Sequence, residues 1–119
     1  MQMRLRSVVL VVALGYVSAA YSAGDPAAGA QKNGMCQGCH GIPGYRHVYP
    51  DYRVPRLGGQ HAQYIINALQ EYKTKARSNT TMQAIAAGLS DQDMQDLAAY
   101  YSAKPAQPAA AAPVGGAKP

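Results

Sequence analysis

Two cysteines and a histidine stand close together in the sequence, as Cys36, Cys39 and His40 in the order Cys-x-x-Cys-His. Two thiols three residues apart can add to the two vinyl groups on one edge of a porphyrin, forming thioethers. The imidazole that follows is then held under the iron as its proximal ligand. The motif therefore predicts one covalently bound haem c, attached at both cysteines, with His40 as an iron ligand.

Three other uses of the same donors are a disulfide, a redox dithiol and part of a zinc site. A Cys-x-x-Cys disulfide closes a very small loop and would add little stability, and the sequence has no third cysteine as a partner. A thiol oxidoreductase carries its motif near a βαβ pattern, which this chain does not show. Cys39 and His40 are adjacent, which is awkward for one tetrahedral zinc centre. Haem attachment is the interpretation that we favour.

The first residues have the pattern of a secretory signal peptide, which we place at residues 1–24. Arg4 and Arg6 precede an apolar run from Val8 to Val17, and small residues follow it. We expect cleavage near residues 20–24, which makes the mature protein an exported, periplasmic one. The alternative is an uncleaved membrane anchor, but ten apolar residues fall short of the roughly 20 that a spanning helix needs. We therefore expect no stable membrane insertion after cleavage.

The expected mature chain is poor in large apolar side chains. The sequence has no Trp and no Phe, and two of its nine Tyr lie in the leader. A domain of this size is marginally stable unless something else supports its core, so the composition also favours a buried haem. Loss of the leader lowers the net charge from +5 to +3. This mild excess, without a long basic run, argues against nucleic-acid binding.

Three helices are predicted in the mature chain, and no strand pattern is visible. One helix begins at Asp25-Pro26 and is weakened by Gly34, one spans His61–Thr74, and one begins after Ser90. Residues 41–60 contain seven Gly or Pro residues, so we expect neither helix nor strand there. Such a long loop in a small domain is expected only where it wraps around a bound group, and we expect this group to be the edge of the haem.

The segments before and after the last helix have the composition of loops. The polar stretch Ser78–Thr81 predicts a loop, followed by Met82 and a short turn at Gln83–Ala87. From residue 104 the sequence changes to Pro, Ala and Gly, which predicts a disordered tail at 104–119. The domain between leader and tail is therefore expected at 25–103.

Taken together, these segments resemble a class I c-type cytochrome, of the small monohaem kind found in the bacterial periplasm. The resemblance covers residues 25–103, and its matching segments are, in chain order, Gly24–Gly29, Cys36–Gly41, Pro55–Gln60 with Tyr64, Met82, Leu89–Asp91 and Leu97–Tyr101. It implies an all-α cytochrome c fold, in which three to five short helices wrap around one covalently bound haem.

The resemblance also implies roles for individual residues. The backbone carbonyl of Pro55 is expected to accept a hydrogen bond from the His40 ring and so to fix the orientation of this ligand. Met82 is implied as the distal axial ligand of the iron. Further candidates for the haem pocket, each of which also fits an ordinary surface or core position, are Arg56, Gln60 and Tyr64.

One departure from the family pattern is visible. Many relatives carry an aromatic residue on the first helix before the cysteines, where this chain has Lys32 and Asn33. We therefore expect thinner packing between the first and last helices, unless a tyrosine compensates.

The choice of Met82 as the second iron ligand has competitors. Met35 lies on the attachment segment itself, and Met94 falls on the apolar stripe of the last helix, where a core methionine is the default. Met82 follows a polar loop far along the chain, from which a ligand can reach the distal face. His47 or His61 would instead give a bis-histidine iron with a lower potential.

Ligation by His40 and Met82 leaves no open iron position, so the predicted function is electron transfer and not catalysis. The protein would shuttle single electrons between redox partner proteins through small, transient contacts. Two basic clusters could steer an acidic partner, line a propionate site or form a solvated surface: Lys73, Lys75 and Arg77, and Arg46, Arg53 and Arg56. An alternative is a haem-bearing subunit of a larger periplasmic oxidoreductase complex, with the tail as a tether.

Overall fold

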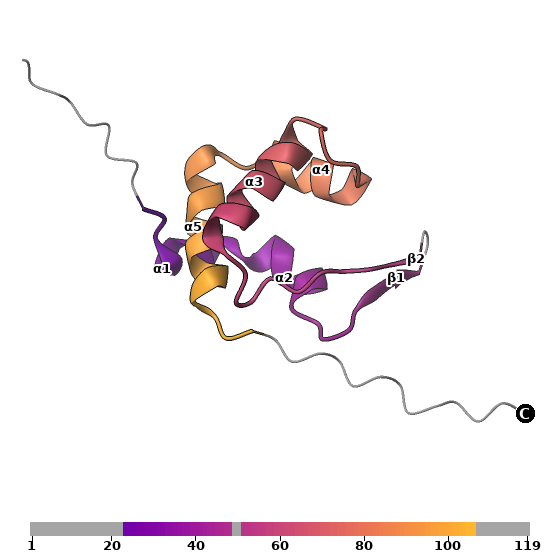
Figure 1. Ribbon diagram of the computed structural model, residues 1–119, viewed down its shortest axis with the longest axis horizontal. Coiled ribbons are helices and arrows are strands. Elements are labelled where there is room, and N and C mark those ends of the chain that lie inside the picture. The colour runs from indigo at the N-terminus through magenta and orange to yellow at the C-terminus, as the bar shows by residue number, and fades with distance from the viewer. Residues whose placement is uncertain (1–22, 49–50, 107–119) are drawn as a thin grey trace, which may run out of the picture.

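The computed structural model describes residues 23–48 and 51–106 of the 119-residue chain. The elements in that part are α1 (Pro26–Lys32), α2 (Gly34–His40), β1 (Arg46–Val48), β2 (Asp51–Arg53), α3 (Ala62–Lys73), α4 (Thr80–Ala87) and α5 (Asp91–Ala103) (Figure 1). This arrangement confirms the predicted all-α cytochrome c fold. The expected leader up to residue 22 and the expected tail beyond residue 106 lie outside the described residues.

The helices begin where capping residues stand in the sequence. The Asp25 carboxylate accepts a hydrogen bond from the backbone nitrogen of Ala27 at 2.8 Å, with Pro26 in the first helical position of α1. Ser90 and Asp93 form a capping box at the start of α5, in which each side chain binds the backbone nitrogen of the other residue. The predicted starts of the first and last helices are thus confirmed.

Three regions differ from the prediction. The single helix expected from Asp25-Pro26 and weakened by Gly34 is two helices, α1 and α2. The stretch expected as a polar loop and a short turn forms the single helix α4, because Asn79 caps it by accepting from the Met82 backbone nitrogen at 2.9 Å. Within the loop expected at 41–60, β1 and β2 pair as an antiparallel hairpin. The expectation that neither helix nor strand occurs there was wrong.

Side-chain pairing across the hairpin explains why it forms. The Arg46 guanidinium forms a bidentate salt bridge with the Asp51 carboxylate, with nitrogen–oxygen distances of 3.1 and 2.7 Å. His47 lies opposite Tyr52, and the two rings stack at 5.0 Å between centroids. Cross-strand pairs of this kind stabilise a sheet, and a count of glycines and prolines does not show them.

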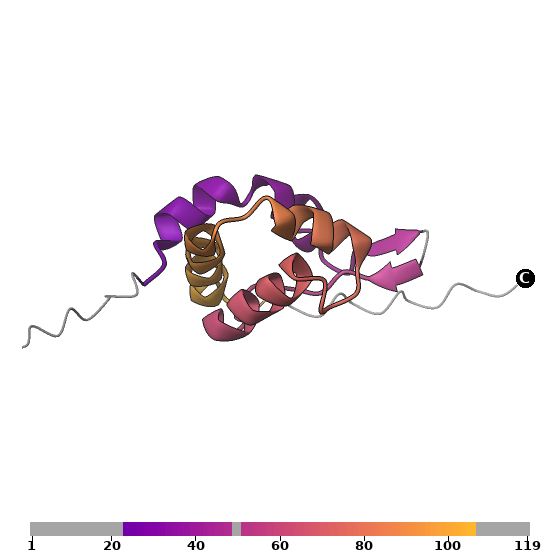
Figure 2. The same cartoon turned by 90° about the horizontal axis from the view of Figure 1, so that it is seen from above.

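The core lies between α3 and α5. Seen from above, α1 and α2 follow one side of the molecule, α3 lies on the other side, and α5 crosses at one end (Figure 2). The buried cluster consists of Ile65, Leu69, Met94, Leu97, Ala98 and Tyr101. Met94 is completely buried in it, as the apolar stripe of the last helix predicts. No helix among residues 23–48 and 51–106 has the length and apolar character needed to cross a membrane.

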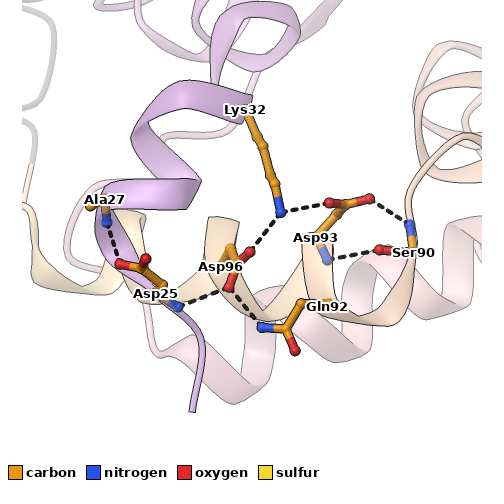
Figure 3. Close-up of polar contacts among 7 residues, drawn as sticks. All are labelled: Asp25, Ala27, Lys32, Ser90, Gln92, Asp93 and Asp96. Atoms are coloured by element: carbon orange, nitrogen blue, oxygen red, sulfur yellow. Dashed lines mark hydrogen bonds and ion pairs between the residues drawn. The ribbon is translucent and has the colours of Figure 1, made fainter. Parts of the chain in front are cut away.

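A polar network joins α1 to α5 where relatives are expected to have aromatic packing (Figure 3). The Lys32 Nζ atom lies 2.7 Å from an Asp93 oxygen and 2.6 Å from an Asp96 oxygen. The other Asp96 oxygen accepts from the Asp25 backbone nitrogen and from the Gln92 amide, both at 2.8 Å. Hydrogen bonding to Lys32 lowers the pKa of both carboxyl groups, and that of Asp96 falls to about 2.

This network predicts a specific loss of stability in acid. Because the pKa of Asp96 falls from its ordinary 3.8 to about 2 on folding, its stabilising effect is complete above about pH 4 and is lost as the pH falls toward 2. In Lys32→Met the free energy of unfolding should be lower at neutral pH and should depend less on pH between 4 and 2. Denaturant titrations followed by circular dichroism at several pH values measure both effects.

Lys75→Met is the matched control for this prediction. Lys75 forms no ion pair with any residue in the described part of the chain, so the variant should keep the acid sensitivity of the unmodified protein. Equal pH profiles for the unmodified protein and Lys32→Met would rule out the proposed role of the network.

Candidate haem site

A cavity of about 470 Å³ opens between α2, the hairpin, the end of α3 and α4. Helix α2 contributes Cys39 and His40 to its lining, and α4 contributes Met82 and Ile85. One cavity is therefore bordered by the residues predicted as a cysteine anchor, the proximal ligand and the distal ligand of one haem. About forty positions of sequence separate Cys39 and His40 from Met82.

His40 is held in one orientation at the edge of this cavity. Its side chain is buried, and Nδ1 lies 2.6 Å from the backbone carbonyl oxygen of Pro55. A ring that donates its Nδ1 proton to this carbonyl leaves Nε2 as the free lone pair for a metal. The contact between His40 and Pro55 is the one that the family resemblance implies.

The two cysteines take different positions on α2. Cys39 lines the cavity, whereas Cys36 packs against the helical core. Both are partly buried free thiols, and burial raises the pKa of the Cys36 thiol. One turn of helix separates them, so they can bind two neighbouring points on the edge of one planar group.

Met82 lies in the first turn of α4. The capping hydrogen bond from its backbone nitrogen to Asn79 fixes this turn, and Asn79 and Thr81 line the cavity beside it. His47 also lines the cavity, but its ring is stacked on Tyr52. His61 is the N-terminal cap of α3 and lies outside the lining.

The charge of the cavity suits a haem. Arg53 and Arg77 line it, and no Asp or Glu of the described residues does. The Arg77 guanidinium lies 5.1 Å from the centroid of the Tyr72 ring and donates to the Tyr64 hydroxyl at 3.4 Å. Haem carries two carboxylates on an apolar ring, so two guanidinium groups among apolar and aromatic side chains fit it.

The three remaining pocket candidates lie outside the lining of this cavity. The Gln60 side chain accepts from the His61 backbone nitrogen at 3.0 Å. Tyr64 is half exposed, and its hydroxyl accepts a hydrogen bond from Arg77, which does line the cavity. Arg56 is likewise absent from the lining.

Sequence reasoning missed several residues that do line the cavity. The most informative of them is Tyr72, whereas Arg77 was considered only as part of a basic cluster that could line a propionate site. Tyr45 and Tyr52 come from the segment that was expected to be a loop around a haem edge, and Arg53 was considered only as part of the other basic cluster. A cation and aromatic residues shortly before the candidate ligand Met82 are the one signal in the sequence that could have indicated this wall.

The fold and the site together define a protein that carries haem on a Cys-x-x-Cys-His helix. The cytochrome c family profile matches residues 27–102. The chain is 44% identical over 100 residues to cytochrome c4 of Thiocapsa roseopersicina, which covers 83% of this chain and 50% of that protein. It is 42% identical over 85 residues to cytochrome c-554(548) of Halomonas halodenitrificans, which covers 69% of this chain and 99% of that protein.

A solved structure of Acidithiobacillus ferrooxidans cytochrome c4 is also similar, with a TM-score of 0.54 and 34% identity, over 67% of this chain and 49% of that one. The chain therefore spans about half the length of the cytochrome c4 relatives it matches. It belongs to the cytochrome c family, as a class I c-type cytochrome with one covalently bound haem c on Cys36 and Cys39.

Proposed function

We propose that this protein transfers single electrons between redox partner proteins, with His40 and Met82 as the two axial ligands of its haem iron. Haem supplies an iron that changes between the ferric and ferrous states. The observation that carries the proposal is that His40 and Met82 line the same cavity, each on a capped or hydrogen-bonded element. Two protein ligands leave no position for a substrate on the iron.

The residues around the cavity have separate tasks in this proposal. Pro55 holds the His40 ring through Nδ1, so that Nε2 would be the nitrogen available to bind the iron. Arg53 and Arg77 balance the two haem carboxylates, with Arg77 held in place by Tyr72. The apolar side chains Val54 and Ile85 exclude water from the site. None of these residues has to move a proton or form a bond to a substrate, so the protein is proposed not to be an enzyme.

Carbon monoxide tests whether both axial positions are filled by the protein. The reduced protein should keep its absorption spectrum when mixed with carbon monoxide at neutral pH, because a low-spin iron with two protein ligands has no free site. An unmodified protein that rapidly forms a carbon monoxide complex would overturn the electron-transfer proposal in favour of a ligand-binding or catalytic haem.

A bis-histidine iron is the second candidate, because His47 lines the cavity with Met82. The parallel stack of His47 on Tyr52, with 4° between the ring planes, argues against it, since ligation by His47 would break this stack. His47→Ala should therefore leave the axial ligands unchanged.

We further propose that the chain is exported to the periplasm and that its leader, residues 1–24, is removed near residues 20–24. The apolar run behind two arginines supports this proposal. Gly24 packs against the backbone of α5, where an added Cβ atom would lie 1.9 Å from the Gln95 carbonyl oxygen. This contact favours the earlier positions in that range, so that the leader would end before residue 24 and Gly24 would stay in the mature chain. The intact mass of protein from a periplasmic extract would show the position.

For the partner proteins we infer only their chemical class. A net charge of +3 without the leader suits transient docking to acidic redox proteins and gives no support to nucleic-acid binding. A haem subunit of a larger oxidoreductase complex remains the alternative, and the chain's span of about half its cytochrome c4 relatives is compatible with it. Size-exclusion chromatography of a periplasmic extract distinguishes a free carrier from a subunit of a complex by the size at which the protein elutes.

A further inference from the structure

The segment between α3 and α4, residues 74–79, leads the chain from one wall of the haem cavity to the helical turn that carries Met82. Lys75 has a left-handed backbone conformation, with a φ of 63°, and turns the chain back at the end of α3. The backbone nitrogen of Arg77 then donates a hydrogen bond to the Glu71 carbonyl oxygen at 3.2 Å. The segment is therefore folded back on α3 before it reaches α4.

The Arg77 side chain adds further contacts with α3. Two of its guanidinium nitrogens donate to the Tyr64 hydroxyl, both at 3.4 Å. The guanidinium also lies 5.1 Å from the centroid of the Tyr72 ring and 6.0 Å from that of Tyr64, within the range of cation–π attraction. Both tyrosines are on α3, which contributes Ile65 and Leu69 to the buried core. Backbone and side chain thus both fix Arg77 to a helix that is anchored in the core.

Arg77 is also hydrogen-bonded to α4, which lies beside α3 (Figure 1). Its carbonyl oxygen accepts a hydrogen bond from the Gln83 Nε2 atom at 2.9 Å, and both residues are partly buried. Gln83 directly follows Met82, whose backbone nitrogen donates to the Asn79 side chain at 2.9 Å. These two hydrogen bonds fix the first turn of α4. The one to Asn79 is local, whereas the one from Gln83 joins the turn, through Arg77, to α3.

We propose that Arg77 and Gln83 are positioning residues for the distal ligand, because the contacts from Tyr64 through Arg77 to Gln83, the Arg77 bridge, hold Met82 in place over the cavity. The inference rests on the ligation by Met82 proposed above and adds the residues that maintain it. An external ligand binds only to molecules in which Met82 has left the iron, so its apparent affinity is proportional to that fraction. Breaking the Arg77 bridge increases the fraction, because the turn loses one of the two hydrogen bonds that fix it.

Titration of the oxidised holoprotein with imidazole tests the proposal. Gln83→Leu keeps a side chain of similar size and removes the amide that donates to Arg77. The net contribution of one hydrogen bond corresponds to a change of about twofold to tenfold in an equilibrium constant, so the affinity for imidazole should rise by this factor. An unchanged affinity in Gln83→Leu would overturn the proposal.

Gln63→Leu is the matched control for this variant. Gln63 also forms a side-chain hydrogen bond, to the Asn67 oxygen at 2.8 Å, but it is exposed on α3 and lies outside the lining of the haem cavity. Its replacement should leave the affinity for imidazole unchanged. An equal rise in both leucine variants would show that the Arg77 bridge has no specific effect on Met82.

Tyr64→Phe tests the other end of the Arg77 bridge, and it also serves if Gln83→Leu fails to acquire haem. Tyr64 is half exposed, so loss of its hydroxyl should leave the fold intact. The affinity for imidazole should rise in the unmodified background. It should not rise further in the Gln83→Leu background, because Arg77 is then no longer joined to α4. An equal rise in both backgrounds, or no rise in either, would contradict the proposal.

Two further measurements separate positioning of the ligand from general stability and from the proposed function. A purely structural role of Gln83 would lower the free energy of unfolding and leave the affinity for imidazole unchanged, which counts against the proposal. Without imidazole, Gln83→Leu should keep the weak red charge-transfer band of an iron–thioether bond. Failure of the proposed function would look different, since the unmodified protein itself would lack this band and would bind carbon monoxide when reduced.

Discussion

Replacing Met82 with alanine should abolish the weak red charge-transfer band that marks an iron–thioether bond in the oxidised protein. The same variant should bind carbon monoxide when reduced, because one axial position is then open. Its reduction potential should fall by a sizeable part of the roughly 0.8 V range over which axial ligands set haem potentials. The physical reason is that a thioether favours ferrous iron more than water or a nitrogen ligand does.

Met35→Ala is the matched control for the Met82 variant. Met35 also lines the cavity, but it is 65% exposed and comes directly before the attachment cysteine. The charge-transfer band should persist in Met35→Ala. Persistence of the band in Met82→Ala, or its loss in Met35→Ala, would show that the ligand has been wrongly assigned.

Gly29→Ala should destabilise the fold by at least about 2 kcal/mol, within the range typical of an overpacked core. A Cβ atom at Gly29 would lie 2.1 Å from the Asp96 carbonyl oxygen and 2.7 Å from the Tyr100 Cβ atom. Neither atom can rotate away, so α1 and α5 must move apart. The gain in helix propensity, up to about 1 kcal/mol, is too small to offset this, and denaturant titration measures the net effect.

Gly34→Ala has the same chemical change without the clash. No atom lies within 4 Å of a Cβ placed at Gly34, which is the first residue of α2. The stability of this variant should be unchanged or higher by up to about 1 kcal/mol. Equal stabilities for the two alanine variants would show that the contact between α1 and α5 does not limit the fold.

The sequence predicted the starts of the first and last helices, because local caps set both of them. Asp25 and Ser90 cap helices through contacts within three residues, and such signals can be read along the chain. Helix α4 was missed because Asn79 was taken as part of a polar loop and not as a cap. The hairpin was missed because Arg46 and Asp51 stabilise it by pairing across the strands, in a segment that its glycines and prolines mark as loop.

The site was predictable to the extent that its residues form one motif. Cys36, Cys39 and His40 are set by their spacing alone, whereas the wall formed by Tyr72 and Arg77 arises only when α3 and α4 close against the hairpin. A side chain's nearness in space depends on this closure, and its one sign in the sequence is a cation and aromatic residues shortly before Met82. The same holds for the buried Asn33, whose amide hydrogen-bonds the hydroxyls of Tyr100 and Tyr101 on α5. The sequence shows there only an amide in place of an aromatic residue.

Near-infrared magnetic circular dichroism of the oxidised, unmodified protein identifies the axial ligands of the iron, because the energy of the charge-transfer band depends on the pair of axial ligands. Because His40 and Met82 line one cavity, we expect the band of histidine–methionine ligation. A band of bis-histidine ligation, or the spectrum of high-spin iron, would contradict it.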